Sequence, residues 1–111
     1  MKLPNRERAQ VPKRKLTKYL LSLSHPVGGP KARFFRSHGF DDTSVDRLRA
    51  ELLGVAQRGE VVETEETAHG TKYVIVGSLL APGGEEISVR TVWIIETPGV
   101  SDPRFVTAYP A

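Results

Sequence analysis

The pattern of apolar residues changes once along this chain, near Gly59, and that change decides the class of fold. Before Gly59, apolar side chains recur every three or four residues, which is the spacing of one face of a helix. After Gly59, alternating or continuous apolar runs are bounded by glycine and proline, a pattern that indicates strands. Helices followed by strands predict an α+β domain in which the helices pack on one face of an antiparallel sheet.

Three N-terminal helices are predicted, over residues 13–22, 30–38 and 45–58. The second begins at a proline, which suits the first position of a helix, and ends before Gly39, a residue type common just after a helix. Ser44 is expected to cap the third helix. The apolar stripes that the first and third helices would bury are Leu16, Tyr19, Leu20 and Leu23, and Val45, Leu48, Leu52, Val55 and Ala56.

Four strands are predicted to follow as an antiparallel meander, over Glu60–Thr67, Thr71–Leu80, Glu86–Glu96 and Arg104–Tyr109. The turns between them are expected over Ala68–Gly70, Pro82–Gly84 and Thr97–Pro103. The central strands are apolar on both faces. Helices can cover one face, so the other needs loops, a partner chain or a bound ligand.

Residues 1–12 are expected to form an extended N-terminal arm, because Pro4 and Pro12 discourage a helix there. Residues 13–111 are expected to form a single α+β domain, since a chain of 111 residues suffices for one core.

Composition excludes several classes of site. The chain has no cysteine, which rules out disulfides and thiolate metal sites. Its three histidines are scattered, and no glycine-rich phosphate loop follows a strand, so we expect neither a metal nor a cofactor. The N-terminus lacks the apolar stretch of a signal peptide, and no apolar run approaches the length of a membrane span. A bacterial cytoplasmic protein is therefore expected, although a delivered toxin domain would have the same features.

The net charge of +3 conceals a strong asymmetry along the chain. Residues 1–40 contain ten Lys or Arg and one acid, whereas residues 41–70 contain three Arg and eight acids. A basic front half can bind a polyanion, or it can simply be a solvated surface whose sign varies. The acids in residues 60–66 are expected to form a solvated strand edge or a docking surface for a basic partner.

The turn and short helix over residues 25–35 hold the first candidate groups. His25 precedes a proline and is either an ordinary polar turn residue or a general acid or base, because imidazole titrates near neutral pH. Lys31 lies in the first helical turn, where a positive charge opposes the helix dipole. It is either a solubilising surface residue or a phosphate ligand that acts with the free N–H groups there. Arg33 and Arg36 are expected to contribute charge rather than specific contacts.

The last strand contains the second set of candidate functional groups. In a regular strand, Thr107 and Tyr109 share a face with Phe105. They either face the core or line the open face of the sheet, where they could donate to a phosphate; a one-residue bulge would exchange the faces. On the neighbouring strand, Thr91 likewise either faces the core or lines the open face. Trp93, on the same strand, is expected to be a core residue.

Several motifs occur here in a familiar order. They are Leu3-Pro4-Asn5, His25-Pro26-Val27-Gly28 with Lys31-Ala32 and Phe34-Phe35, Thr91-Val92-Trp93-Ile94-Ile95, and Pro103-Arg104-Phe105-Val106-Thr107-Ala108-Tyr109-Pro110. With these motifs, the chain resembles over nearly its whole length a family of small bacterial proteins of unknown function.

The first half, with Leu16-Thr17-Lys18-Tyr19-Leu20-Leu21 before the His-Pro turn, is also similar to C-terminal domains of bacterial polymorphic toxins. Those domains are grouped with the barnase, EndoU, colicin and RelE ribonucleases, which have helices followed by a four-stranded antiparallel sheet. This resemblance implies metal-independent RNA cleavage at the open face of the sheet. It implies the catalytic positions His25, Lys31, Arg104, Thr107 and Tyr109, with Arg33, Arg90 and Thr91 as RNA-binding residues.

The residues support two hypotheses. The first is a toxin-like ribonuclease that cleaves RNA by attack of the 2′-hydroxyl. Its partners would be RNA, with tRNA as one candidate, and a cognate antitoxin or immunity protein. The second is a non-catalytic module of the same fold that binds protein or RNA. An antitoxin or immunity role is less attractive, because the N-terminal half is cationic. The ribonuclease hypothesis requires the turn at residues 25–35 and the final strand to meet at one hollow.

Overall fold

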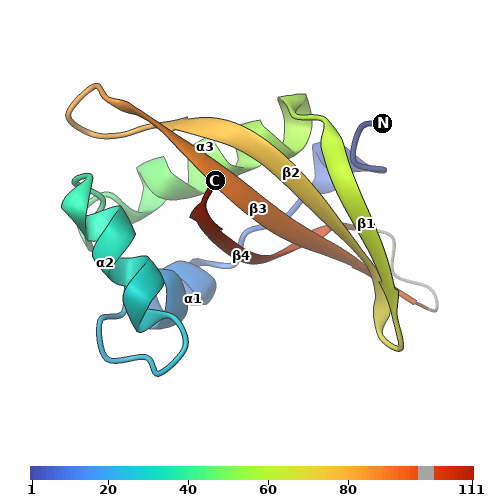
Figure 1. Cartoon of the computed structure of the whole chain (residues 1–111), viewed down its shortest axis with the longest axis horizontal. Helices are drawn as coiled ribbons and strands as arrows, with labels where there is room; N and C mark the ends of the chain where they lie inside the picture. Colours follow the sequence, from blue (N-terminus) through green and yellow to red (C-terminus); the bar gives the residue numbers. More distant parts are fainter. Residues whose placement is uncertain (98–101) are drawn as a thin grey trace.

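The computed structural model describes residues 1–97 and 102–111 and has an α+β architecture (Figure 1). The helical segments are η1 (Arg6–Arg8), α1 (Lys13–Lys15), η2 (Leu16–Leu20), α2 (Gly29–Ser37) and α3 (Val45–Arg58). The strands are β1 (Val61–Thr67), β2 (Gly70–Leu80), β3 (Glu86–Glu96) and β4 (Arg104–Pro110), which form one antiparallel sheet in the order β1-β2-β3-β4. The predicted class and the four-stranded meander are confirmed. The helices are not all N-terminal, because α3 occupies the middle of the chain.

The helical segment that begins at Lys13 changes its hydrogen-bonding pattern at Leu16. η2 is a π-helix, in which the Leu21 amide donates to the Leu16 carbonyl, five residues back, at 2.8 Å. The wider turn brings Leu21 into the core beside Leu16 and Leu20, while Leu23 is 56% exposed. The predicted burial of Leu23 is therefore wrong, because it assumed a regular α-helix.

α3 has the bounds that its apolar stripe predicted, and it packs against β2 and β3 with Leu48 and Leu52 fully buried. Ser44 stands at its N-terminus, but the side chain does not cap the helix. Its hydroxyl donates to the Asp41 carbonyl and accepts from the Asp41 amide, at 3.1 and 2.8 Å. The predicted cap is wrong, because Ser44 lacks the extended backbone of a capping residue and closes the preceding loop instead.

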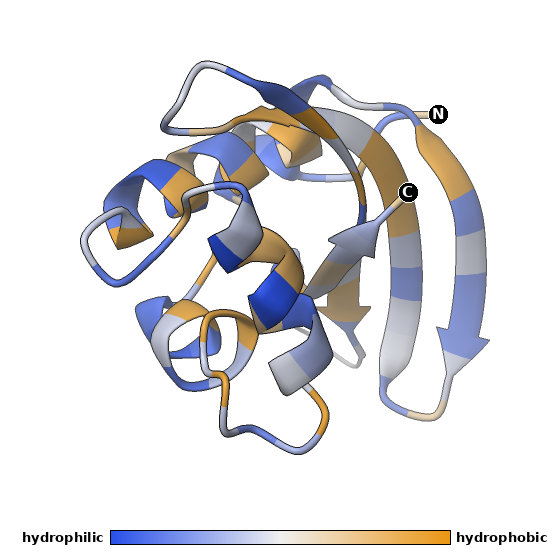
Figure 2. Cartoon of the chain, turned by 60° about the vertical axis from the view of Figure 1, so that its left-hand side comes forward, coloured by the Kyte–Doolittle hydropathy of each residue, from blue (hydrophilic) through white to orange (hydrophobic). Residues whose placement is uncertain are grey.

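The helices gather on one side of a curved sheet, and the core lies between the two layers (Figure 2). Trp93 is fully buried on this core face, with its ring 5.4 Å from that of Phe105 in an edge-to-face contact. Thr91 is also buried here. Its hydroxyl donates to the Ile75 carbonyl and accepts from the Trp93 indole N–H, each at 2.9 Å. The prediction that Trp93 is a core residue is confirmed.

A bulge in β4 decides which of its side chains face the core. Phe105 pairs with Trp93, and Thr107 pairs with the residue before Trp93 on β3, so Val106 is an extra residue. Phe105 therefore faces the core, while Thr107 and Tyr109 lie on the opposite face. Of the two alternatives that the sequence left open, the structure has Thr107 and Tyr109 on the open face.

Residues 1–12, predicted as an extended arm, lie against the domain. Leu3 and Val11 are buried in the core, and Gln10 forms a parallel bridge with Arg104 on the free edge of β4. Of the predicted loop Thr97–Pro103, residues 98–101 lie outside the described residues. None of the helices in the described parts of the chain is long and apolar enough to span a membrane.

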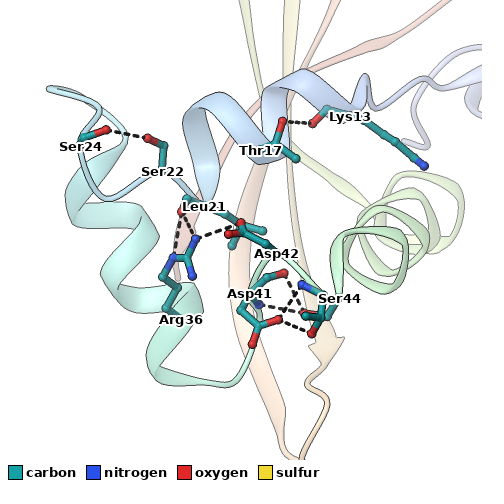
Figure 3. Close-up of polar contacts among 10 residues, drawn as sticks. Lys13, Thr17, Leu21, Ser22, Ser24, Arg36, Asp41, Asp42 and Ser44 are labelled. Carbon is teal, nitrogen blue, oxygen red and sulfur yellow. Dashed lines mark hydrogen bonds and ion pairs between the residues drawn. The ribbon is translucent and has the colours of Figure 1, made fainter.

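Arg36 joins the helical segments that carry the candidate site (Figure 3). Its Nε and Nη2 donate to the Leu21 carbonyl, just after η2, at 2.9 and 2.7 Å. Nη2 also pairs with Asp42, in the loop after α2, at 3.1 Å. The expectation that Arg36 contributes only charge is wrong, because its side chain lies back against the end of η2 and holds α2 beside it.

We expect Arg36→Met to lower the free energy of unfolding by about 1–3 kcal/mol, because the Leu21 carbonyl loses a charged donor. Urea unfolding followed by circular dichroism measures the change. Asp42→Asn is the matched control: the Asp42 side chain is 73% exposed, so its loss should cost less than about 1 kcal/mol. Equal losses in the two variants would contradict the importance of the carbonyl contact.

Candidate functional site

Three side chains from distant parts of the chain meet beside β4. Lys31 Nζ, on α2, donates to the Tyr19 phenol oxygen at 2.8 Å. The same oxygen, on η2, lies 2.8 Å from Thr107 Oγ1 on β4, although the two residues are 88 positions apart. α2 itself contacts β4. The fold thereby places an ammonium, a phenol and a hydroxyl in one hydrogen-bonded row, called here the Lys31–Tyr19–Thr107 row.

The row changes the acid–base behaviour of Tyr19. Partial burial alone would raise the pKa of the Tyr19 phenol, but hydrogen bonds to Lys31 and Thr107 and the charges of Lys31 and Lys15 outweigh it and lower the pKa below its ordinary value of 10.0. The two ammonium groups also lie close to the Tyr19 ring, with Lys15 Nζ 4.6 Å and Lys31 Nζ 5.4 Å from its centroid. The Tyr19 phenol therefore loses its proton more readily than an ordinary tyrosine does.

His25 adjoins the row, but its own turn fixes it. Its ring meets the Tyr19 ring edge-on, with the centroids 5.0 Å apart. Nδ1 accepts from the amides of Val27 and Gly28 at 3.0 and 2.9 Å. Nε2 therefore carries the ring hydrogen and presents a donor. This geometry leaves Nε2–H as the group that His25 can present to a ligand.

A hollow of about 360 Å³ opens beside Tyr19. It is lined by Pro12, Arg14, Lys15, Lys18, Tyr19 and His25. A second hollow, of about 250 Å³, shares Pro12 and Lys15 and reaches Arg104 on β4. Tyr109 completes the set, since Lys31 Nζ lies 6.0 Å from the centroid of its ring. Cations next to hydroxyl groups form a surface suited to a phosphate.

Four of the five residues predicted to be catalytic belong to the row or adjoin it: His25, Lys31, Thr107 and Tyr109. The turn and helix over residues 25–35 and the final strand therefore meet through side-chain contacts, but they do not share one hollow, because His25 lines the first and Arg104 lines the second. Arg104 stands apart, because it lies at the start of β4 and its guanidinium pairs with Glu96 on β3.

The three residues predicted to bind RNA are scattered. Arg33 is exposed on α2. Arg90 lies on the open face of the sheet and pairs with Glu63 of β1 at 3.3 Å. Thr91 is fully buried on the core face, with its hydroxyl engaged by two partners. The predicted contact of Thr91 with RNA is wrong, because no part of its side chain reaches the open face.

Sequence reasoning missed Tyr19. Its helical spacing placed it among the apolar side chains of the first helix, and its ring does pack against the core. The available signal was that Tyr19 alone in that stripe has a polar end, and a half-buried phenol needs a hydrogen-bond partner.

Comparison with known proteins adds a family and a fold. A family model described as a domain of unknown function (DUF6883) matches residues 2–111. The chain belongs to this family. Among solved structures, it is similar to a chain of a contact-dependent growth inhibition toxin–immunity protein complex from Klebsiella pneumoniae 342, with a TM-score of 0.69, 14% identity and 96% of each chain covered. At that identity the likeness shows the fold alone. No curated protein matches the sequence.

Gly28 sets how closely the turn approaches η2 in this member of the family. A Cβ atom there would lie 2.4 Å from the Tyr19 carbonyl oxygen, a backbone atom that cannot swing aside. We expect Gly28→Ala to lower the free energy of unfolding by roughly 1–3 kcal/mol, measured by urea unfolding. Gly83→Ala is the control, because a Cβ there meets nothing within 4 Å, and its effect should stay within about 0.5 kcal/mol. Equal effects would show that the close approach is unimportant.

The Tyr19 phenol should ionise below its ordinary pKa of 10.0. Absorbance titration of the phenolate should therefore show an ionisation below pH 10.0 that Tyr19→Phe removes. Lys31→Met should raise this pKa, because it removes a hydrogen bond and a charge. Since the folded pKa lies below the unfolded one, the stability gained from ionisation is fully present above pH 10.0 and is lost as the pH falls through the folded pKa. Identical titrations of wild type and Tyr19→Phe would contradict the assignment.

Proposed function

We propose that this chain is a toxin-like, metal-independent ribonuclease that cleaves RNA by attack of a 2′-hydroxyl on the adjacent phosphorus. The observation that carries the proposal is the Lys31–Tyr19–Thr107 row at the edge of a cationic hollow. The row combines a positive charge, a phenol of lowered pKa and a hydroxyl. Cleavage of a phosphodiester needs those three functions: charge stabilisation, a base and a hydrogen-bond donor.

The reaction would be a single displacement. The 2′-oxygen forms a bond to phosphorus while the bond from phosphorus to the 5′-oxygen breaks, which leaves a 2′,3′-cyclic phosphate and a 5′-hydroxyl. The Tyr19 phenolate would take the proton of the 2′-hydroxyl, and Lys31 would stabilise charge on the phosphoryl oxygens. Thr107 would donate to the phenolate, and Tyr109 would donate to those oxygens. His25 Nε2–H would donate to the leaving 5′-oxygen, which takes its proton from solvent.

The remaining cations would contact the RNA on either side of the cleaved bond. Arg104 lines the second hollow, Arg33 is exposed on α2, and Arg90 lies on the open face. Their role would be affinity rather than chemistry, because two of them are already paired with glutamates.

A nuclease of this kind would need an inhibitor in the cell that makes it, so the partner would be a cognate antitoxin or immunity protein. The structural neighbour supports this part of the proposal, since it is described as a toxin–immunity protein complex. Either role is compatible with a shared fold. The ten basic residues and one acid in residues 1–40 favour the RNA-cutting role for this chain. The finer assignment of the fold as barnase- or RelE-like belongs to the same proposal.

Induced expression in bacteria tests the function. Wild type should arrest growth, and purified protein should degrade total RNA or tRNA in the presence of a chelator. Tyr19→Phe should be harmless. Tyr73→Phe is the matched control, because the Tyr73 hydroxyl makes no hydrogen bond to another described residue. If expression of wild type is harmless and the purified protein leaves RNA intact, the ribonuclease proposal is wrong. The alternative would then be a non-catalytic module of this fold that binds protein or RNA.

A further inference from the structure

The segment that precedes Tyr19 contains basic residues that do not contact the Lys31–Tyr19–Thr107 row. The Lys13 Nζ forms an ion pair with Asp46 of α3 at 3.0 Å. Arg14 and Lys18 differ, because both are exposed and neither makes an ion pair or a hydrogen bond with any residue in the described parts of the chain. Both line the hollow beside Tyr19. Two cations with no partner of their own therefore border the candidate site.

The same hollow also has flat, weakly polar walls. Pro12, the Tyr19 ring and the His25 ring line it together with the cations. The two rings meet at 90° with their centroids 5.0 Å apart, so together they form two aromatic walls of different orientation. Its volume of about 360 Å³ is in the range of small-ligand sites. Aromatic and proline surfaces next to cations suit a nucleotide, whose base packs on the rings while its phosphate meets Arg14 or Lys18.

We propose that this hollow is a subsite for the nucleotide next to the cleaved phosphodiester, in a single-stranded segment of RNA. The inference rests on the proposed function, because the Lys31–Tyr19–Thr107 row would hold the cleaved phosphate itself. Bases in a duplex stack on one another, so their faces cannot reach protein rings. A base that enters the hollow must be unpaired and unstacked. The substrate class is therefore a loop or another unpaired stretch, with Arg14 and Lys18 on its backbone.

A binding experiment with a strand that cannot be cleaved tests the subsite. The probe is a fluorescein-labelled 2′-O-methyl RNA of about 10 nucleotides, within the range of sizes that single-strand sites cover. Its methylated 2′-oxygens cannot attack phosphorus. Fluorescence anisotropy at several salt concentrations compares wild type with the Arg14→Ala/Lys18→Ala double variant. The control is Lys2→Ala/Arg58→Ala, which removes the same charge near the N-terminus and the far end of α3 (Figure 1).

Loss of two phosphate contacts should reduce the salt slope by about 1.4 and weaken binding about 25-fold at 0.1 M salt, since each contact on a single strand contributes about 0.7 to the slope. The control should bind within about threefold of wild type, because neither Lys2 nor Arg58 lines the hollow. A 2′-O-methyl duplex of equal length should compete poorly. Equal weakening in both variants, or equal competition by the duplex, would overturn the subsite.

The two proposals fail in different ways. If wild type cleaves an unmodified strand while the Arg14→Ala/Lys18→Ala variant binds the probe like the control, the subsite is wrong and the ribonuclease stands. If binding depends on Arg14 and Lys18 but no unmodified strand is ever cleaved, the ribonuclease and its subsite are both wrong, and the hollow is a binding site for single-stranded RNA in a non-catalytic module. The Arg14 and Lys18 side chains are both exposed, so urea unfolding should show the Arg14→Ala/Lys18→Ala variant folded with wild-type stability.

Discussion

Lys31→Met is expected to slow RNA cleavage at least about 100-fold, the loss typical when one donor to a developing oxyanion is removed. Lys31 would act twice in the proposed reaction. It would stabilise charge on the phosphoryl oxygens, and its contact with the Tyr19 oxygen lowers the pKa of that phenol. The variant therefore loses a charge stabiliser and weakens the base at once. Single-turnover cleavage of a labelled RNA measures the rate of the chemical step.

Lys13→Met is the matched control for this result. It makes the same chemical change on α1, but Lys13 pairs with Asp46 away from the row. Its rate should stay within about threefold of wild type, because an exposed ion pair contributes little. Cleavage by folded Lys31→Met at the wild-type rate would contradict the role of the row. An equal loss in Lys13→Met would show that only net charge matters.

Trp93→Ala should have the largest effect on stability, about 3–5 kcal/mol of unfolding free energy. The side chain is fully buried, it packs edge-to-face on Phe105, and its N–H donates to Thr91. Truncation would leave a cavity between the sheet and the helices and would deprive the Thr91 hydroxyl of a donor. Urea or thermal unfolding monitored by circular dichroism measures the loss.

Leu80→Ala provides the comparison. Leu80 is also a large apolar side chain in the sheet, but it is 41% exposed, so its truncation should cost no more than about 1 kcal/mol. A loss below about 1 kcal/mol in Trp93→Ala would contradict the assignment of Trp93 to the centre of the core. The result would then require a rearranged sheet.

The local fold was predictable where one strong pattern acts alone. The stripe of α3 and the alternation along β3 each bury one face, and no competing signal opposes them. The pattern failed where one residue changes the geometry. A π-helical turn buries Leu21 in place of Leu23, which a regular α-helix would bury. The bulge at Val106 places Thr107 on the opposite face of the sheet from Phe105. Both insertions depend on packing against distant segments, which a local pattern does not contain.

The site was predictable only in part for the same reason. The sequence indicated a functional role for three residues, because they are polar groups in a rigid turn or near a strand end: His25, Lys31 and Thr107. It indicated none for Tyr19, since its ring satisfies the apolar stripe and only the tertiary fold brings its oxygen to Lys31 and Thr107. Thr91 is the opposite case. Its polar side chain suggested a functional role, but its hydroxyl accepts a hydrogen bond from the Trp93 indole in the core.

Analysis of the cleavage products tests the central claim most directly. A short single-stranded RNA is incubated with the purified protein in a chelator, and the new ends are identified by mass spectrometry. The account predicts a 2′,3′-cyclic phosphate and a 5′-hydroxyl, with no cut where the attacking 2′-hydroxyl is replaced by hydrogen. Uncut RNA, a 5′-phosphate product, or cleavage at the deoxy-substituted nucleotide would contradict it.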